Sequence, residues 1–130
     1  MWSTNIEKDT IANKDWRRVV HTSKRLQVVL MAIPPGESLG LEVHPETDQF
    51  FRIERGAAIL QAGKKEHLLV DGSSAVVPSG VWHNITNTSK TRWLKLYTIY
   101  SPPHHPKNRV DKTKADEMAR ESRKKVPKKK

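Results

Sequence analysis

Residues 36–56 read GESLGLEVHPETDQFFRIERG, and residues 72–87 read GSSAVVPSGVWHNITN. Successive side chains of a strand point to opposite faces, so Glu42 and His44 are expected on one face. Pro45 stops that run, and Gln49 begins a new strand that returns toward the same space. His83 follows another turn. Two imidazoles, one carboxylate and one amide oxygen make a plausible cage for a metal ion.

Short segments of residues that favour β-strands lie within these two stretches and on either side of them. Helical periodicity is absent from residues 17–101. Turn residues such as Pro34-Pro35-Gly36, Asp71-Gly72 and Pro78-Ser79-Gly80 separate the runs. The segments expected to form strands are 19–20, 26–33, 39–44, 49–53, 57–61, 66–70, 75–77, 82–86 and 93–100. This pattern predicts an all-β fold, a small double-sheet barrel with an interior of ligand size.

The spacing of the fixed residues resembles the cupin superfamily, in particular its small single-domain conserved-barrel (cupin 2) proteins. The first cupin motif is G-x5-H-x-H-x3/4-E-x6-G, and the matching frame here is Gly36-x5-Glu42-x-His44-x4-Gln49-x6-Gly56. The second motif, G-x5-P-x-G-x2-H-x3-N, is matched at every fixed position by Gly72-x5-Pro78-x-Gly80-x2-His83-x3-Asn87. The segments EVHPETDQFFRIERG and SPPHHPK are similar to those of a bacterial branch with an E-V-H…D-Q-F signature. The resemblance implies an RmlC-like jelly-roll barrel (a double-stranded β-helix).

Two positions depart from the family motif. Glu42 stands where the first histidine is usual, and Gln49 stands where the glutamate is usual. The resemblance implies Glu42, His44, Gln49 and His83 as ligands of a divalent metal ion, Fe, Mn, Ni or Zn. Two histidines and one carboxylate suit non-haem Fe(II). Gln49 is either a weak fourth ligand or a group that holds a water. The alternative is a barrel that has lost its metal and keeps the histidines as cavity walls.

The alternation of side chains along each strand predicts which large residues near this site point into the barrel. Phe51 and Ile53 follow Gln49 in phase, so we expect them to line the barrel interior. Trp82 adjoins His83 and points the other way, which predicts core packing. Either Tyr97 or Tyr100 could supply a hydroxyl to the pocket.

Two further pairs flank the predicted barrel. Trp2 and Trp16 are expected to pack on it. His104 and His105 lie between prolines, where they either form a segment that covers the barrel or bind metal.

The excess positive charge lies in the last residues. The chain of 130 residues has a formal net charge of +10, and residues 107–130 hold eleven of its 24 basic residues. We expect a cupin barrel over residues 1–106 and a basic tail over 107–130. Few apolar residues in the tail predict a largely disordered or short-helical segment, with Thr113 and Asp116 at capping-box spacing. The tail is either a solvated end or an arm for an acidic partner. Nucleic acid is not favoured, because no aromatic residue is interleaved with the lysines.

Composition excludes several classes of protein and site. The chain has no cysteine, which excludes disulfides, thiolate nucleophiles and thiolate metal ligands. The longest apolar run, 28–33, is far shorter than the ~20 residues that a membrane span needs. The first ten residues are polar and resemble no secretory signal, so a cytoplasmic protein is predicted. The resemblance also implies a homodimer.

The function implied by the resemblance is metal-dependent chemistry on a small molecule inside the barrel. Dioxygenase-like chemistry ranks slightly above sugar-isomerase-like chemistry, because the ligand set has facial-triad composition. The alternative is a non-catalytic module that binds a metal or small ligand, with the basic tail contacting an acidic partner. Fold alone does not choose between these functions.

Overall fold

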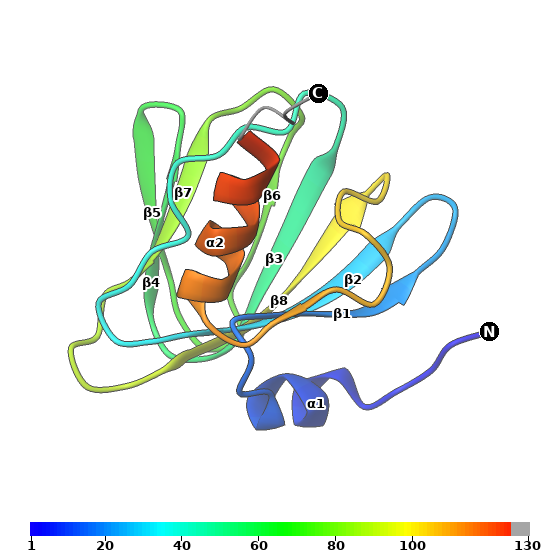
Figure 1. The fold of residues 1–130 in the computed structure, drawn as a ribbon. Helices are drawn as coiled ribbons and strands as arrows, with labels where there is room; N and C mark the ends of the chain where they lie inside the picture. Colours follow the sequence, from blue (N-terminus) through cyan, green and yellow to red (C-terminus); the bar gives the residue numbers. More distant parts are fainter. Residues whose placement is uncertain (126–130) are drawn as a thin grey trace.

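The computed structural model describes the backbone of residues 1–125 and the side chains of residues 1–122. Nine strands and two helices make up this part of the chain (Figure 1). In chain order they are α1 (Ile6–Ala12), β1 (Arg17–Thr22), β2 (Gln27–Ile33), β3 (Asp48–Arg55), β4 (Ala58–Ala62), β5 (Lys65–Leu69), β6 (Ser74–Val77), β7 (His83–Asn87), β8 (Leu94–Ser101), β9 (Val110–Asp111) and α2 (Lys114–Lys125).

The strands form two antiparallel sheets that face each other. The larger sheet has the order β6-β3-β8-β2-β1-β9, and the smaller has the order β5-β4-β7. Consecutive strands β3 and β4 lie in different sheets, and the chain changes sheet at Gly56 (φ 113°). A Cβ at this glycine would lie 3.2 Å from the backbone oxygen of Trp93. The double-sheet barrel predicted from the strand pattern is confirmed.

The core lies between the two sheets. Burial alternates along β3, β7 and β8, so every second side chain of these strands points inward. Phe51 and Ile53 are fully buried, as the strand phase predicts. β2 is buried at all seven positions, because α1 packs on the outer side of the large sheet against β2, β3 and β8.

Segment 39–44 differs from the sequence prediction. It forms no strand and makes only isolated bridges, Ser38 with Thr86 and Glu42 with His83. Gly40 has a φ of 94°, and this left-handed backbone interrupts extended pairing. The segment therefore crosses the end of the barrel as a loop held at two points.

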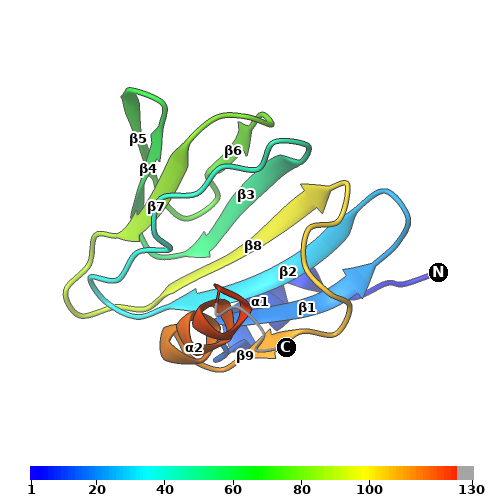
Figure 2. The same ribbon diagram turned by 45° about the horizontal axis from the view of Figure 1, so that its top comes forward.

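The basic segment after residue 106 includes a helix, so the short-helical alternative is confirmed. The amide of Asp116 donates to Thr113 Oγ1 at 3.1 Å, and the amide of Thr113 donates to Asp116 Oδ2 at 3.2 Å. This is the reciprocal capping predicted from the spacing. Figure 1 shows α2 in front of the space between the two sheets, and Figure 2 shows it beside β9 and β1. Residues 126–130 of the predicted tail lie outside the described residues.

Three side chains attach α2 to the barrel. Glu117 accepts hydrogen bonds from Trp16 Nε1 and Arg17 Nη1. Lys114 Nζ donates to Glu37 Oε1 at 2.8 Å and to the Ser38 carbonyl at 2.7 Å. Arg120 pairs with Asp111 of β9. The domain boundary predicted at residues 106/107 stays a prediction, and these contacts cross it. Within residues 1–125, neither helix has the length and apolar character needed to cross a bilayer.

Candidate metal centre and the cavity beside it

The predicted ligands come from three parts of the fold. Glu42 and His44 lie on the loop between β2 and β3, Gln49 lies on β3, and His83 is the first residue of β7. Two backbone hydrogen bonds, Glu42 N to His83 O at 2.8 Å and His83 N to Glu42 O at 2.9 Å, fix the loop against β7. A third, from the Gly80 amide to the His44 carbonyl at 2.9 Å, holds the turn before β7.

The ligand atoms of Glu42, His44 and His83 converge. One atom from each lies within 4.8 Å of the other two, a grouping that could hold a metal ion. His44 Nε2 is 3.2 Å from Glu42 Oε2. The two histidines are 6% and 2% exposed, so they face the barrel interior and not solvent. The predicted loop and strand faces are therefore brought together as expected.

The hydrogen bond at Nδ1 of His83 favours the tautomer whose Nε2 lone pair faces the site. Its Nδ1 is 3.0 Å from the Val81 carbonyl, which can only accept, so Nδ1 carries the proton. The neutral ring then has its lone pair on Nε2. This atom is 3.1 Å from Gln49 Oε1, because the Gln49 amide group donates to Thr98 Oγ1 at 3.0 Å. Two acceptors thus face each other, and a cation between them would satisfy both.

His44 supplies a second nitrogen available for binding. Neither of its ring nitrogens has a well-directed hydrogen-bond partner within the described residues, although both are buried. Buried polar atoms in native proteins are almost always partnered. An unpartnered imidazole, a carboxylate and an imidazole lone pair form the donor set that divalent transition metals prefer. The residues present therefore fit a divalent metal ion.

The carboxylate of Glu42 is held in its charged form. Burial acts to raise its pKa, but the contact with His44 and the positive charge of Arg17 outweigh burial and hold the pKa below its usual value. A carboxylate must be ionised to ligate a metal. The surroundings of Glu42 thus favour the state that ligation requires.

A cavity of about 580 Å³ opens beside these ligands. Glu42, His44, His104 and His105 line one part of it, and α2 closes another. The apolar part of the wall comes from Leu39, Leu41, Val43, Trp82 and Met118. The volume suits a small molecule.

Several side chains near the cavity differ from the sequence assignments or resolve open alternatives. Trp82 was predicted in the core, but it is 54% exposed and lines the cavity. It precedes β7, in a loop where strand alternation does not apply. Tyr100 is buried with its ring centroid 5.7 Å from that of His44, while Tyr97 lies on the outer face near Phe50. His104 reaches over the barrel mouth, with ring centroids 4.2 Å from His44.

The sequence analysis did not identify Glu117, which lines the cavity, or its partner Arg17 behind the wall. Arg17 is 2% exposed, and Glu117 contacts it from a helix one hundred residues later in the chain. No local motif links the two positions, because their proximity arises only from the docking of α2.

Comparison with known proteins identifies the family to which this fold belongs. Residues 29–100 match the family model described as cupin domain, which is more than half of the chain. The chain belongs to the cupin family. Both cupin motifs lie inside the matched region, and the predicted recognition and fold are confirmed.

Named relatives support the same assignment. This cupin is 49% identical over 123 residues to the uncharacterised protein YrkC of Bacillus subtilis (strain 168), covering 90% of this chain and 66% of that protein. It is 45% identical over 114 residues to the uncharacterised protein L612 of Acanthamoeba polyphaga mimivirus, covering 85% and 71%. The solved structure of BH2720 from Bacillus halodurans matches with a TM-score of 0.88 and 44% identity, covering 91% and 93%. The chain spans about two thirds of the length of the two uncharacterised relatives.

Proposed function

We propose that this cupin is a metal-dependent enzyme that acts on a small molecule in the cavity between the barrel and α2. The convergence of Glu42, His44 and His83 within 4.8 Å carries the proposal. Glu42 and His44 also line the cavity, so a metal ion held by this group would be reached from it. When bound, the metal supplies Lewis-acid or redox chemistry at those positions.

Dioxygenase-like chemistry remains our first choice of reaction class. Two histidines and one carboxylate are the ligand set of the non-haem Fe(II) oxygenases, and the same set accepts Mn, Ni or Zn. Isomerase chemistry requires a general base beside the substrate carbon. The metal ligands do not supply one, because their lone pairs are committed to the metal.

The protein contributes orientation and exclusion of water. The bridge between Glu42 and His83 and the Val81 carbonyl fix the ligands without help from the substrate. The apolar wall and α2 shield the metal-facing end of the cavity, which strengthens electrostatic interactions there. A preformed site of this kind binds its ligand at lower entropic cost.

Metal content measured by mass spectrometry tests the proposal directly. We expect about one divalent metal ion per chain in the wild type and none in the His44→Ala/His83→Ala variant. The matched control is His21→Ala/His67→Ala, which removes two histidines on β1 and β5 that lie outside the ligand group. Metal-free wild type that takes up no metal on titration would refute the proposal. Retention of metal by the His44→Ala/His83→Ala variant would refute this ligand set.

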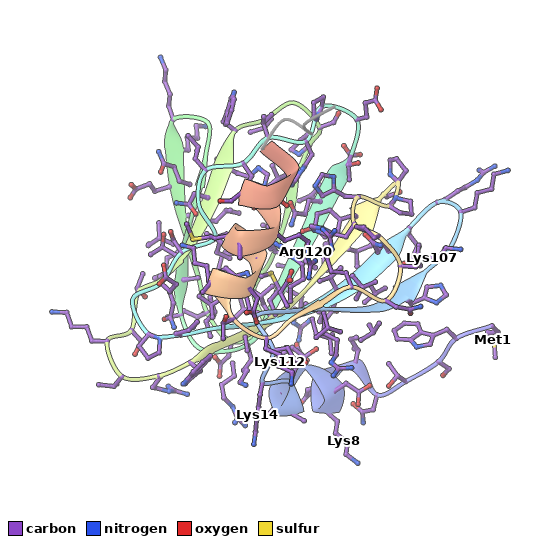
Figure 3. All side chains as sticks on the ribbon, viewed as in Figure 1. Met1, Lys8, Lys14, Lys107, Lys112 and Arg120 are labelled. Atoms are coloured by element: carbon purple, nitrogen blue, oxygen red, sulfur yellow. The ribbon has the colours of Figure 1, made fainter. Side chains whose placement is uncertain are left out.

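A non-catalytic binding module is the second candidate function, and the same cavity supports it. A binder holds a stoichiometric ligand without turnover, whereas an enzyme consumes it. Oxygen-uptake and isomerase assays on the metal-loaded protein separate the two. The acidic-partner hypothesis has less support, since Lys114 and Arg120 already pair with Glu37 and Asp111. In Figure 3, Arg120 and Lys112 are labelled on the segment around α2, and Lys14 and Lys8 are labelled near α1. The homodimer and the cytoplasmic location stay predictions.

A further inference from the structure

A buried arginine lies behind Glu117, a residue that lines the cavity. Arg17, the first residue of β1, is 2% exposed, and its Nη1 donates to Glu117. Its Nε is buried and has no hydrogen-bond partner among the described residues. A guanidinium has five N–H donors and stays charged in proteins. Glu117 and the nearby Tyr100 hydroxyl therefore engage only part of the binding capacity of Arg17.

Other unpartnered polar atoms gather beside Arg17. They are Tyr100 Oη, His105 Nε2 and the ring nitrogens of His44, all buried within the part of the chain that the structure describes. The ring of Tyr100 lies 5.0 Å from that of His105 and 5.7 Å from that of His44, between centroids. Native proteins leave few such atoms unpaired, and a cluster of them indicates a bound polar group. His44 and His105 line the cavity, and Arg17 and Tyr100 lie behind its wall. A polar group that enters this end therefore meets several buried N–H and O–H groups.

Glu117 occupies part of this donor-rich end. Its carboxylate accepts from Trp16 Nε1 and Arg17 Nη1, and its side chain lines the same cavity as Glu42 and His44. It comes from α2, while both donors come from the start of the barrel. Two N–H donors that hold a carboxylate of the protein can hold a carboxylate of a ligand in the same way.

The balance of buried charge favours a ligand carboxylate that replaces Glu117 over one that binds beside it. Burial acts to lower the pKa of Arg17, but its interactions with Tyr100, Glu117 and Glu42 outweigh burial and raise the pKa. A third carboxylate would add another buried negative charge to a group with one guanidinium, and unpaired buried charges are costly. If the carboxylate of the ligand takes the place of Glu117, the number of buried charges stays the same.

We infer that the cavity takes a small organic acid whose carboxylate replaces Glu117 on Arg17 and Trp16. Its apolar part lies against Leu41, Trp82 and Met118. This inference rests on the proposed function and names the substrate class of the same site. Glu117 then acts as an internal competitor, and α2 carries it into the site whenever no acid is bound.

Calorimetric titration of metal-free protein with benzoate tests the inference, because coordination to a metal cannot contribute there. Glu117→Gln removes the competing charge and leaves Arg17 intact. We expect this variant to bind benzoate about tenfold to a hundredfold more tightly than the wild type, the range of a hydrogen bond to a charged group. Benzamide, which lacks the charge, should show no gain. Equal benzoate affinity in the variant and the wild type would overturn the inference.

Two further variants control this result. Glu121→Gln removes a carboxylate from the same helix and cavity wall, but Glu121 is not among the partners of Arg17. Its benzoate affinity should equal that of the wild type. Adding Arg17→Met to Glu117→Gln should abolish the gain. A gain of the same size in Glu121→Gln, or one that persists without Arg17, would show a non-specific charge effect and refute the site.

A measurement on the wild type avoids any dependence on how the variants fold. Saturating benzoate should shift the indole N–H resonance of Trp16 in a ¹⁵N NMR spectrum, since the acceptor of that hydrogen bond changes. An unmoved resonance would overturn the inference. Titration of wild type with Mn²⁺ distinguishes the two proposals. Metal binding without a benzoate effect refutes the organic-acid site alone, and a benzoate effect without metal binding refutes the metal centre alone.

Discussion

Gln49 shows how one residue changes the electrostatics of the site. Its side chain is 1% exposed, carries no charge and lies between those of Thr98 and His83. The family motif places a glutamate here, and in this chain the carboxylate is at position 42 instead. The number of carboxylates in the ligand set stays at one. A neutral amide is also easier to bury without a metal than a second carboxylate beside Glu42.

The variant Gln49→Glu should therefore make the barrel dependent on metal. Without metal it adds a buried charge, and we expect a loss of about 3–5 kcal/mol in the free energy of unfolding. With metal it adds a strong ligand and should recover most of that loss. Urea unfolding in chelator and in Mn²⁺ measures both effects, with Gln49→Met as the uncharged control. Equal stability of Gln49→Glu and wild type in chelator would contradict this account.

Residues of the site could be predicted from the sequence where a local pattern fixes them. His44 and His83 each lie at a constant spacing from glycines and prolines that set the turns, so their convergence follows from the motif. Arg17 and Glu117 have no such pattern, because a helix that docks across the barrel brings them together. Trp82 was misassigned because strand alternation begins one residue later.

At the scale of elements, the placement of α2 depends on a few polar contacts. The helix is capped by Thr113 and Asp116, and Lys114 attaches its first turn to the loop that precedes the candidate metal ligands. The side chains of Lys114 and Glu37 are 27% and 43% exposed, so solvent screens their attraction. The hydrogen bonds from Lys114 and from the Ser38 amide hold the pKa of Glu37 below its ordinary value of 4.5.

This pair should make α2 docking dependent on pH. A carboxyl group with a lowered folded-state pKa stabilises the fold above its unfolded value, and the effect is lost as the pH falls through the folded value. Lys114→Ala should therefore destabilise the protein slightly at pH 7 and have no effect well below pH 4.5. Thermal melts across this range check the prediction, with the exposed Lys112→Ala as control. A difference between Lys114→Ala and wild type that persists in acid would rule out Glu37 as its origin.

Gly56 is the element-scale position with the tightest backbone constraint. Its φ of 113° disfavours any side chain, and a Cβ would approach Leu94 and the Trp93 carbonyl at 3.2 Å. We expect Gly56→Ala to lower the free energy of unfolding by about 1–3 kcal/mol, whereas Gly63→Ala, with φ 58° and open space, should cost less. Chemical denaturation of both variants measures the difference. If Gly63→Ala lost more free energy of unfolding than Gly56→Ala, the contact with Trp93 and Leu94 would not be what excludes a side chain at position 56.

The strands that could be predicted from the sequence are those in which apolar and polar residues alternate regularly. Buried alternating strands such as β3 and β8 fall where the pattern places them, within a few residues. The loop 39–44 was predicted as a strand because its residues favour β structure, but Gly40 adopts a left-handed backbone there. Helix α1 went unpredicted, although Asn5 caps it by accepting from the Lys8 amide at 3.0 Å.

At the scale of the whole molecule, the candidate ligands join the two sheets. Gln49 belongs to the large sheet and His83 to the small one, and Glu42 bridges to His83 from the crossing loop. A metal ion held between them would link surfaces that otherwise meet mainly through apolar side chains. Metal binding should therefore stabilise the entire barrel and not a single loop.

Chelation should lower the melting temperature, and added metal should raise it in a concentration-dependent way. Ligand that binds only the folded state contributes about 2.7 kcal/mol at a hundredfold excess over its Kd. The His44→Ala/His83→Ala variant should show no such rise. Differential scanning calorimetry over a series of Mn²⁺ concentrations measures the effect. A melting temperature independent of metal in the wild type would contradict the link between the sheets.

The position of α2 in the chain has a consequence for the order in which the protein folds. All the strands of the two sheets precede the helix, and the polar contacts that attach α2 to them come from its side chains. The two sheets can therefore pair before the helix docks. Until α2 docks, Glu117 is away from Arg17 and the mouth of the cavity is not covered by the helix. A metal ion or small molecule could then enter first, and docking of α2 would be the last step of folding.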